Sequence, residues 1–186
     1  MEIQPIVVIH GGAWAIPDSL VEKSLEGVKT AATIALELLQ SGKSALDAVE
    51  AAVSSLENDP TFDAGTGSVL NSKGEVEMDS MIMEGENLRC GSVACVSNVK
   101  NPVQLARHIM EHTDHVMLVG PGAVDYAKEN NFPMVPTDQL VTTEAVKTWE
   151  TFVKYNKAVK TLFNGVVCSN GVPEMNGYVK NLNNII

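Results

Sequence analysis

Residues 59–85 read DPTFDAGTGSVLNSKGEVEMDSMIMEG, from Asp59 to Gly85. The stretch begins with a glycine-rich loop, Phe62 to Gly67, and a short strand-like run, Ser68 to Asn71, follows it. The turn Ser72-Lys73-Gly74 then leads into a long predicted strand, Glu75 to Met83. Glycines let a loop fold tightly, and loops beside strands are frequent places for small-molecule sites. This stretch is therefore the first candidate for a functional site.

The residues before this stretch predict one strand and two helices. Ile6 to Ile9 is a short apolar run rich in β-branched residues, which is typical of a strand buried on both faces. Pro17-Asp18, with the capping box Ser19-x-x-Glu22, predicts the start of a helix that ends at Ser41-Gly42. Ser44 is the predicted N-cap of the second helix, so the two helices form an αα-hairpin.

The residues after this stretch alternate between predicted strands and helices. Leu88 to Ser97 directly follows the Glu75–Met83 strand and predicts an antiparallel hairpin. The further predicted elements are a helix from Asn101-Pro102 to about Glu111, a buried strand Val116 to Val119, a helix from Gly120-Pro121-Gly122 through Asn130, and a helix capped by Thr143. This order predicts a layered α/β fold over residues 1–163, followed by an irregular tail, 164–186.

The composition is that of an acidic globular protein. The chain has 186 residues, 45% hydrophobic and 19% charged, and a formal net charge of -10. Its length suits one domain, and its charge argues against a nucleic-acid partner, because phosphate binding needs clustered Lys and Arg. Three cysteines without a C-x-x-C pattern predict free thiols in a reducing compartment. No run reaches the roughly 20 apolar residues of a membrane span, and the first residues lack a signal-peptide pattern, so we expect a cytoplasmic protein with no membrane partner.

Two patterns of ionisable residues offer alternative sites. His108-Ile109-Met110-Glu111-His112 matches H-x-x-E-H, whose two histidines share a helix face and can bind zinc. The helix is expected to stop at Thr113-Asp114 and no later helix offers an obvious third ligand, so histidines at a helix end are the simpler interpretation. Glu75, Glu77 and Asp79 alternate along one strand face, where paired carboxylates can run acid–base chemistry, although such a row is more typical of a solvated face.

The glycine-rich loop itself offers main-chain carbonyl groups around Asp59, Phe62, Ala64 and Thr66. A curled loop of inward-facing carbonyls suits a hard cation. His10-Gly11-Gly12, taken alone, is interpreted as a structural turn. The sequence contains no G-x-S-x-G, no P-loop and no G-x-G-x-x-G, so none of these motifs identifies its chemistry.

Taken together, several ordered motifs are more informative than any one of them. They are Val8-Ile9-His10-Gly11-Gly12-Ala13, Ser44-Ala45-Leu46-Asp47-Ala48-Val49-Glu50, Leu56-Glu57-Asn58-Asp59-Pro60, Phe62 to Asn71, Gly74 to Asp79, and Ile82-Met83-Glu84-Gly85. This series resembles the isoaspartyl peptidase/L-asparaginase family of threonine-type N-terminal-nucleophile hydrolases. The similarity extends in order from Ile6 to about Phe163.

The resemblance implies the first half of a four-layer αββα sandwich. It implies a precursor that cleaves itself before a threonine, whose freed α-amino group then serves as base for its own hydroxyl nucleophile. The implied substrates are the side-chain amide of asparagine and the isoaspartyl peptide bond. Gly11, Gly12 and Asp63 are implied to support the active site, and sodium is the one implied ion. Its implied ligands are the main-chain carbonyls of Leu56, Glu57, Asp59, Phe62, Ala64 and Thr66.

The sequence departs from the family pattern at the nucleophile. No Gly/Asp-Thr-Val-Gly run is present, and neither Thr151 nor Thr161 is followed by Val-Gly, so we expect no catalytic threonine and no activity of the chain alone. Asp63 stands where many members carry Asn, and an ionised carboxylate accepts hydrogen bonds but cannot donate them. The alternative is a non-catalytic partner of a full-length homologue, because half a sandwich exposes an apolar sheet face and unpaired strand edges.

Overall fold

The computed structural model describes residues 4–13 and 16–164. These residues belong to two compact units, Met1–Trp149 and Glu150–Ile186, which divide inside the last helix. The elements in order are α1 (Asp18–Gln40), α2 (Ala45–Glu57), β1 (Met78–Met83), β2 (Cys90–Val96), α3 (Pro102–His112), β3 (Met117–Val119), α4 (Gly120–Glu129), α5 (Thr137–Leu140) and α6 (Thr143–Asn164). No helix of the described ranges is long and apolar enough to cross a membrane.

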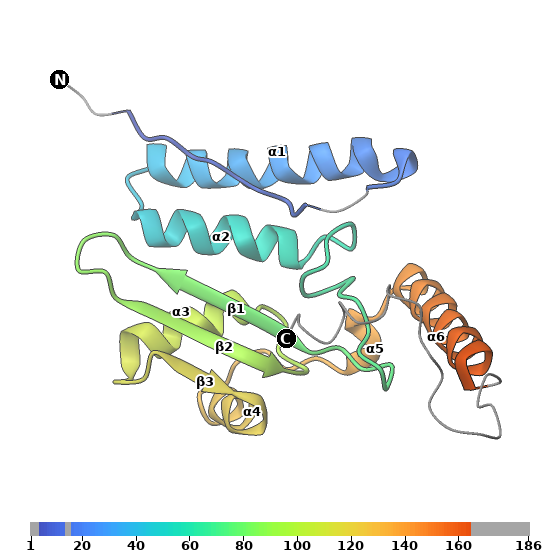
Figure 1. Cartoon of the computed structure of the whole chain (residues 1–186). Helices are drawn as coiled ribbons and strands as arrows, with labels where there is room; N and C mark the ends of the chain where they lie inside the picture. Colours follow the sequence, from blue (N-terminus) through green and yellow to red (C-terminus); the bar gives the residue numbers. More distant parts are fainter. Residues whose placement is uncertain (1–3, 14–15, 165–186) are drawn as a thin grey trace, which may run out of the picture. The chain divides into compact units, whose positions relative to one another are not determined.

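Helices α1 and α2 lie side by side as the predicted αα-hairpin (Figure 1). Small side chains at their contact, such as Ala31 and Ala52, are fully buried and allow close packing. Ser44 caps α2 as expected: its hydroxyl accepts the Asp47 N–H, and the Asp47 carboxylate accepts the Ser44 N–H, both at 3.1 Å. The capping box expected at Ser19 is wrong, because Ser19 lies inside α1 and Pro17 occupies the N-cap position.

The sheet has the order β1-β2-β3, with β1 antiparallel and β3 parallel to β2. The predicted hairpin is confirmed, but its first strand begins at Met78 rather than at Glu75. The run 68–71 is not a strand. The Asn71 side chain accepts the N–H groups of Lys73 and Glu75 at 2.9 and 3.0 Å, so the local polar bonds favour a turn over a strand ladder.

Among the described residues, helices cover only one face of this sheet. In Figure 1, α3 lies behind β1 and β2, and its Leu105 and Ile109 share a core with Val93 and Val96 of β2. Helix α4 contributes Ala123 to the same core. The opposite face carries apolar side chains that stay between 49% and 61% exposed: Met81, Met83, Met117 and Val119. The layered α/β prediction is therefore confirmed, with one apolar sheet face open in the part of the chain that the structure describes.

Two segments predicted as buried strands are exposed. Residues 6–9 form no strand, and Ile6 and Val8 are 88% and 86% exposed, whereas Val7 and Ile9 pack on the α1–α2 core. A buried strand needs partners for its N–H and C=O groups, and the described residues supply none to this segment. The strand expected at residues 116–119 is present as β3, but it lies at the sheet edge and is not buried.

The later helices begin close to their predicted positions. Asn101 and Pro102 open α3 as expected, and Gly120 opens α4. Thr142, rather than Thr143, caps α6: its hydroxyl accepts the Ala145 N–H at 3.1 Å. The expected irregular tail falls, apart from Asn164, outside the described residues.

Candidate functional site

Two predicted parts of the site, distant in sequence, line one cavity of about 590 Å³. Gly11 and Gly12 come from the segment before α1, and Asp63 comes from the glycine-rich loop after α2. The loop's Phe62 ring is packed against Gly11, where a Cβ would lie 2.9 Å from the ring. The structure thus brings together all three residues that were expected to support an active site.

The glycine-rich loop is held in a tight curl. Gly65 and Gly67 have φ angles of +60° and +102°, which residues with side chains rarely adopt. A Cβ on Gly65 would collide with the Glu57 carbonyl, and one on Gly67 would lie 2.7 Å from the Pro60 oxygen. Two backbone hydrogen bonds, each of 2.8 Å, close the curl. The Thr66 N–H donates to the Glu57 oxygen, and the Gly67 N–H donates to the Leu140 oxygen.

Asp63 lies at the exposed side of this loop. Its Oδ1 accepts the backbone N–H of Val69 at 2.7 Å, which fixes the carboxylate relative to the loop. Among the residues that the structure describes, its Oδ2 accepts no hydrogen bond. The ionised form of a carboxylate only accepts hydrogen bonds and cannot donate them, so in that form Asp63 offers an acceptor to this cavity.

His10 lines the same cavity, next to the two glycines. Its Nδ1 accepts the Gly12 N–H at 3.1 Å, so the neutral ring carries its proton on Nε2. Gly12 has a φ angle of +99° and nothing lies within 4 Å of a Cβ built on it. The His10-Gly11-Gly12 turn is therefore fixed by one local bond and leaves open space beside its second glycine.

The six carbonyls expected to hold sodium belong to the same curled loop and the end of α2. Three of them already accept backbone N–H groups: Leu56 from Asp59 at 3.2 Å, Glu57 from Thr66 at 2.8 Å and Asp59 from Phe62 at 3.1 Å. Each carbonyl keeps a second lone pair. The Phe62 oxygen lies 3.0 Å from a Cβ built on Gly67, so carbonyls crowd the positions where only glycine fits. Main-chain oxygens are the kind of donor that a hard cation prefers.

Glu57 is buried where α2 ends, with 3% of its surface exposed. Its Oε1 accepts the Val103 N–H at 2.9 Å, and its Oε2 accepts the Asn101 side-chain N–H at 3.0 Å. Burial raises the pKa of Glu57 to about 7, although the bonds from Asn101 and Val103 oppose that rise. Sequence reasoning assigned only the main-chain carbonyl of this residue, because its burial depends on how α2 packs on α3.

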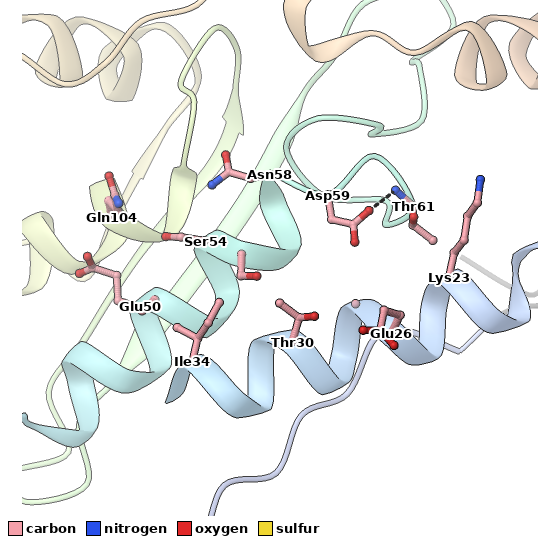
Figure 2. Close-up of a pocket in the computed structure, with 13 residues that line it drawn as sticks. Lys23, Glu26, Thr30, Ile34, Glu50, Ser54, Asn58, Asp59, Thr61 and Gln104 are labelled. Carbon is pink, nitrogen blue, oxygen red and sulfur yellow. Dashed lines mark hydrogen bonds between the residues drawn. The ribbon is translucent and has the colours of Figure 1, made fainter. Parts of the chain in front are cut away.

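A second cavity, of about 720 Å³, lies between α1, α2 and the start of α3 (Figure 2). Its wall mixes charges, with Lys23 and Glu26 on α1 and Glu50 on α2. Asp59 also reaches it, where its Oδ1 accepts the Thr61 N–H at 2.9 Å, drawn as a dashed line in Figure 2. None of the residues expected to support an active site lines this cavity, so it is not the candidate site.

The alternative sites lack the arrangement that their chemistry needs. The rings of His108 and His112 stack at 4.1 Å, His108 contacts the Asn130 side-chain oxygen at 3.3 Å, and His112 bonds back to the His108 carbonyl. Within residues 4–13 and 16–164, no three His, Cys, Asp or Glu side chains are placed to hold a metal ion. Glu75, Glu77 and Asp79 are all exposed, as a solvated face requires.

Sequence reasoning missed one wall of the candidate cavity. The cavity is also lined by four residues at and after the start of α6: Thr142, Glu144, Ala145 and Thr148. Only the N-cap pattern at Thr142 and Thr143 signals that a helix begins there. The contact of that helix start with the loop is tertiary, and no local pattern encodes it.

Comparison with known proteins gives a consistent picture. The asparaginase family model matches residues 3–178. A relative from Danio rerio named isoaspartyl peptidase/L-asparaginase is 49% identical over 146 residues, which are 78% of this chain and 47% of the relative. The Homo sapiens protein of that name is 48% identical over 141 residues, 75% of this chain and 46% of the relative. A plant-type L-asparaginase from Pyrococcus horikoshii is 47% identical over 145 residues, 77% of this chain and 46% of the relative.

The matches cover most of this chain but only part of each relative. The chain spans about half the length of the curated relatives it matches. The matched residues include the His10-Gly11-Gly12 turn, the glycine-rich loop and the hairpin that follows it. This chain therefore belongs to the asparaginase family.

Proposed function

We propose that this chain is the first-half portion of an isoaspartyl peptidase/L-asparaginase. In this role it supplies the wall and the supports of the active site and is inactive alone. The observation that carries the proposal is the cavity shared by Gly11, Gly12 and Asp63, in a chain that covers about half of its relatives. The reaction is hydrolysis of the asparagine side-chain amide and of isoaspartyl peptide bonds.

In the complete enzyme the nucleophile is a threonine at the start of the other half, freed by autocatalytic cleavage. Its hydroxyl oxygen forms a bond to the amide carbon, and the C–N bond breaks to release ammonia or an amine with the hydroxyl proton. Water then hydrolyses the resulting ester. Asp63 positions this threonine by accepting a hydrogen bond at Oδ2, while its Oδ1 stays bonded to Val69. Gly12, with open space around it, leaves room for the small substrate.

The structural ion in this proposal is sodium, held by the main-chain carbonyls of Leu56, Glu57, Asp59, Phe62, Ala64 and Thr66. The crowding of carbonyls against Gly65 and Gly67 supports it. The ion would bind these carbonyl oxygens and would stabilise the curl of the loop. It takes no part in bond breaking.

Co-expression tests the proposed function. The partner is the part of the Danio rerio relative that this chain does not cover. The purified pair should release ammonia from L-asparagine and aspartate from an isoaspartyl dipeptide, and Asp63→Ala should reduce both rates at least about tenfold, as expected for loss of a hydrogen bond to a reacting group. A purified pair that hydrolyses neither substrate would contradict the proposal.

The second candidate function is a non-catalytic partner of a full-length homologue. The open apolar face of Met81, Met83, Met117 and Val119 favours it, because exposed patches of this kind mark interaction surfaces. Co-expression with the intact Danio rerio relative should then give a co-purifying complex, and Met81→Lys should weaken it. A sharp monomer peak in size exclusion, with no binding of a hydrophobic dye, argues against this second function.

A cytoplasmic location is part of the same proposal. The free thiols of Cys90 and Cys95 support it, since reducing compartments keep thiols unpaired. Fractionation of cells that express the tagged chain tests the location. Recovery in a secreted or membrane fraction would contradict it.

A further inference from the structure

We propose that Glu57 is a positioning residue of the candidate site, whose carboxylate holds the first turn of α3 while its main-chain carbonyl holds the glycine-rich loop. The position of the loop is then set by two elements at once, α2 and α3. The structural part of this inference stands by itself, and its consequence for catalysis rests on the proposed function. Glu57 is a positioning residue and not a catalytic one, because it does not line the cavity of Asp63.

The side chain of Glu57 acts as the cap of another helix. The first N–H groups of any helix lack partners within the helix. In α3, the side chain of the N-cap residue Asn101 makes no capping bond, and Glu57 Oε1 instead accepts the Val103 N–H at 2.9 Å. The Asn101 side chain donates to Glu57 Oε2 at 3.0 Å. Both carboxylate oxygens are therefore used at the start of α3.

The main chain of Glu57 holds the loop. Its carbonyl oxygen accepts the Thr66 N–H at 2.8 Å, and Gly65 approaches the same carbonyl so closely that no Cβ fits. Asp63 lies in the loop that this bond closes. Because Glu57 is the last residue of α2, a shift of its side chain moves its carbonyl as well, and the shift is passed on to the loop.

The other charged contacts between α2 and α3 lie elsewhere. Arg107 of α3 pairs with Asp47 at 2.8 Å and with Glu50 at 3.1 Å. These side chains are 37% and 24% exposed, against 3% for the whole of Glu57, and both lie earlier in α2, farther along the chain from the loop. Glu50 is therefore a matched control: it is a carboxylate of the same helix, facing the same neighbour, without a bond to the loop.

The test is amide hydrogen exchange, followed by NMR in the full chain. Glu57→Leu removes the acceptor, Glu57→Gln keeps an oxygen for the Val103 N–H, and Glu50→Gln is the control. Glu57→Leu should speed exchange about tenfold at both Val103 and Thr66, the effect of losing a bond of ordinary strength. Glu57→Gln should stay within about threefold of the unmodified chain, on the same scale, and Glu50→Gln should change neither amide.

The Thr66 amide separates positioning from simple capping. Its partner is the main-chain oxygen of Glu57, which no substitution removes. Faster exchange at Val103 alone, with Thr66 and Val69 unchanged, would overturn the proposal. If Glu57→Leu also accelerates the core amide of Val93, the chain has unfolded. Glu57→Asp then decides, because its shorter side chain withdraws from Val103 but keeps the carboxyl group. Joint acceleration at Val103 and Thr66 in that variant supports the proposal, and any other pattern overturns it.

The catalytic consequence is measured separately, in the co-expressed pair. Glu57→Leu should reduce asparagine hydrolysis and Glu57→Gln should restore it. Coupled exchange without hydrolysis by the unmodified pair would mean that the proposed function fails while the positioning role stands. Hydrolysis by the unmodified pair, with exchange accelerated at Val103 but not at Thr66, would mean that the proposed function stands and the positioning role fails.

Discussion

The carboxylate of Asp63 accepts a 2.7 Å hydrogen bond from the backbone N–H of Val69, six residues further along the chain. This bond closes the exposed side of the glycine-rich loop, while the Thr66 N–H and the Glu57 oxygen close its buried side. Hydrogen bonds within this chain therefore set the shape of the loop. The two carboxylate oxygens of Asp63 have different partners: Oδ1 accepts the Val69 N–H, and Oδ2 is the oxygen that we propose accepts a hydrogen bond from the threonine.

The first prediction concerns the contribution of the Asp63–Val69 hydrogen bond to stability. Asp63→Ala removes the bond to Val69 and should lower the free energy of unfolding by about 1 kcal/mol, the usual net value for such a bond. Asp63→Asn keeps an oxygen acceptor and should cost less. Urea unfolding of the three proteins measures the difference. Equal losses in the two variants would show that the bond to Val69 is not what the carboxylate contributes.

Gly65 carries the second prediction. Gly65→Ala places a Cβ against the Glu57 carbonyl at a φ angle of +60°, and should cost about 2 kcal/mol or more of unfolding free energy. Gly85→Ala is the control, because nothing lies within 4 Å of a Cβ there. Thermal unfolding of both variants measures the difference. A Gly65 variant as stable as the Gly85 variant would contradict the curl described for this loop.

The pH dependence of stability is the third prediction. Burial raises the pKa of Glu57 from 4.5 to about 7, so between these values the unfolded chain loses a proton that the folded chain retains. The contribution of Glu57 to stability is therefore complete below about pH 4.5 and is lost as the pH rises through 7, at most about 3 kcal/mol. Glu57→Gln should remove this part of the dependence. Urea unfolding at pH 5 and pH 7.5, in sodium-free buffer, checks it, and parallel pH profiles for the two proteins would disprove it.

Sodium binding is the fourth prediction. A ligand that binds only the folded state raises its stability, and tenfold more free ligand adds about 1.4 kcal/mol once the site is near saturation. Sodium chloride should therefore raise the melting temperature above that in choline chloride of equal ionic strength. Gly67→Ala, whose Cβ would lie 2.7 Å from the Pro60 oxygen, should remove the difference between the two salts. Equal melting temperatures of the unmodified chain in both salts would mean that no such site exists.

Local patterns predicted most of the helices and the hairpin. Ser44 and Asp47 form a cap entirely within one turn, and Asn101-Pro102 fixes a helix start by its own geometry. Such signals need no tertiary information. The strands were less well predicted, because whether residues 6–9 form a strand depends on partners for their backbone groups, and the described residues include none.

Only part of the site could be predicted from the sequence, because the rest depends on tertiary contacts. Gly65 and Gly67 are visible in the sequence because their conformations demand glycine. The roles of Thr142 and of the Glu57 side chain are not visible, since each depends on contacts between elements far apart in the sequence. The motif resemblance connected Gly12 with Asp63, and the fold places both at one cavity.

The most direct test of the central claim is hydrolysis by this chain alone. The claim is that these residues form the supports of a hydrolase site whose nucleophile they do not supply. The purified 186-residue chain is incubated with L-asparagine and with an isoaspartyl dipeptide, beside the intact Danio rerio relative as a positive control. We expect no ammonia or aspartate above the protein-free blank. Clear release of either product by the chain alone would contradict it.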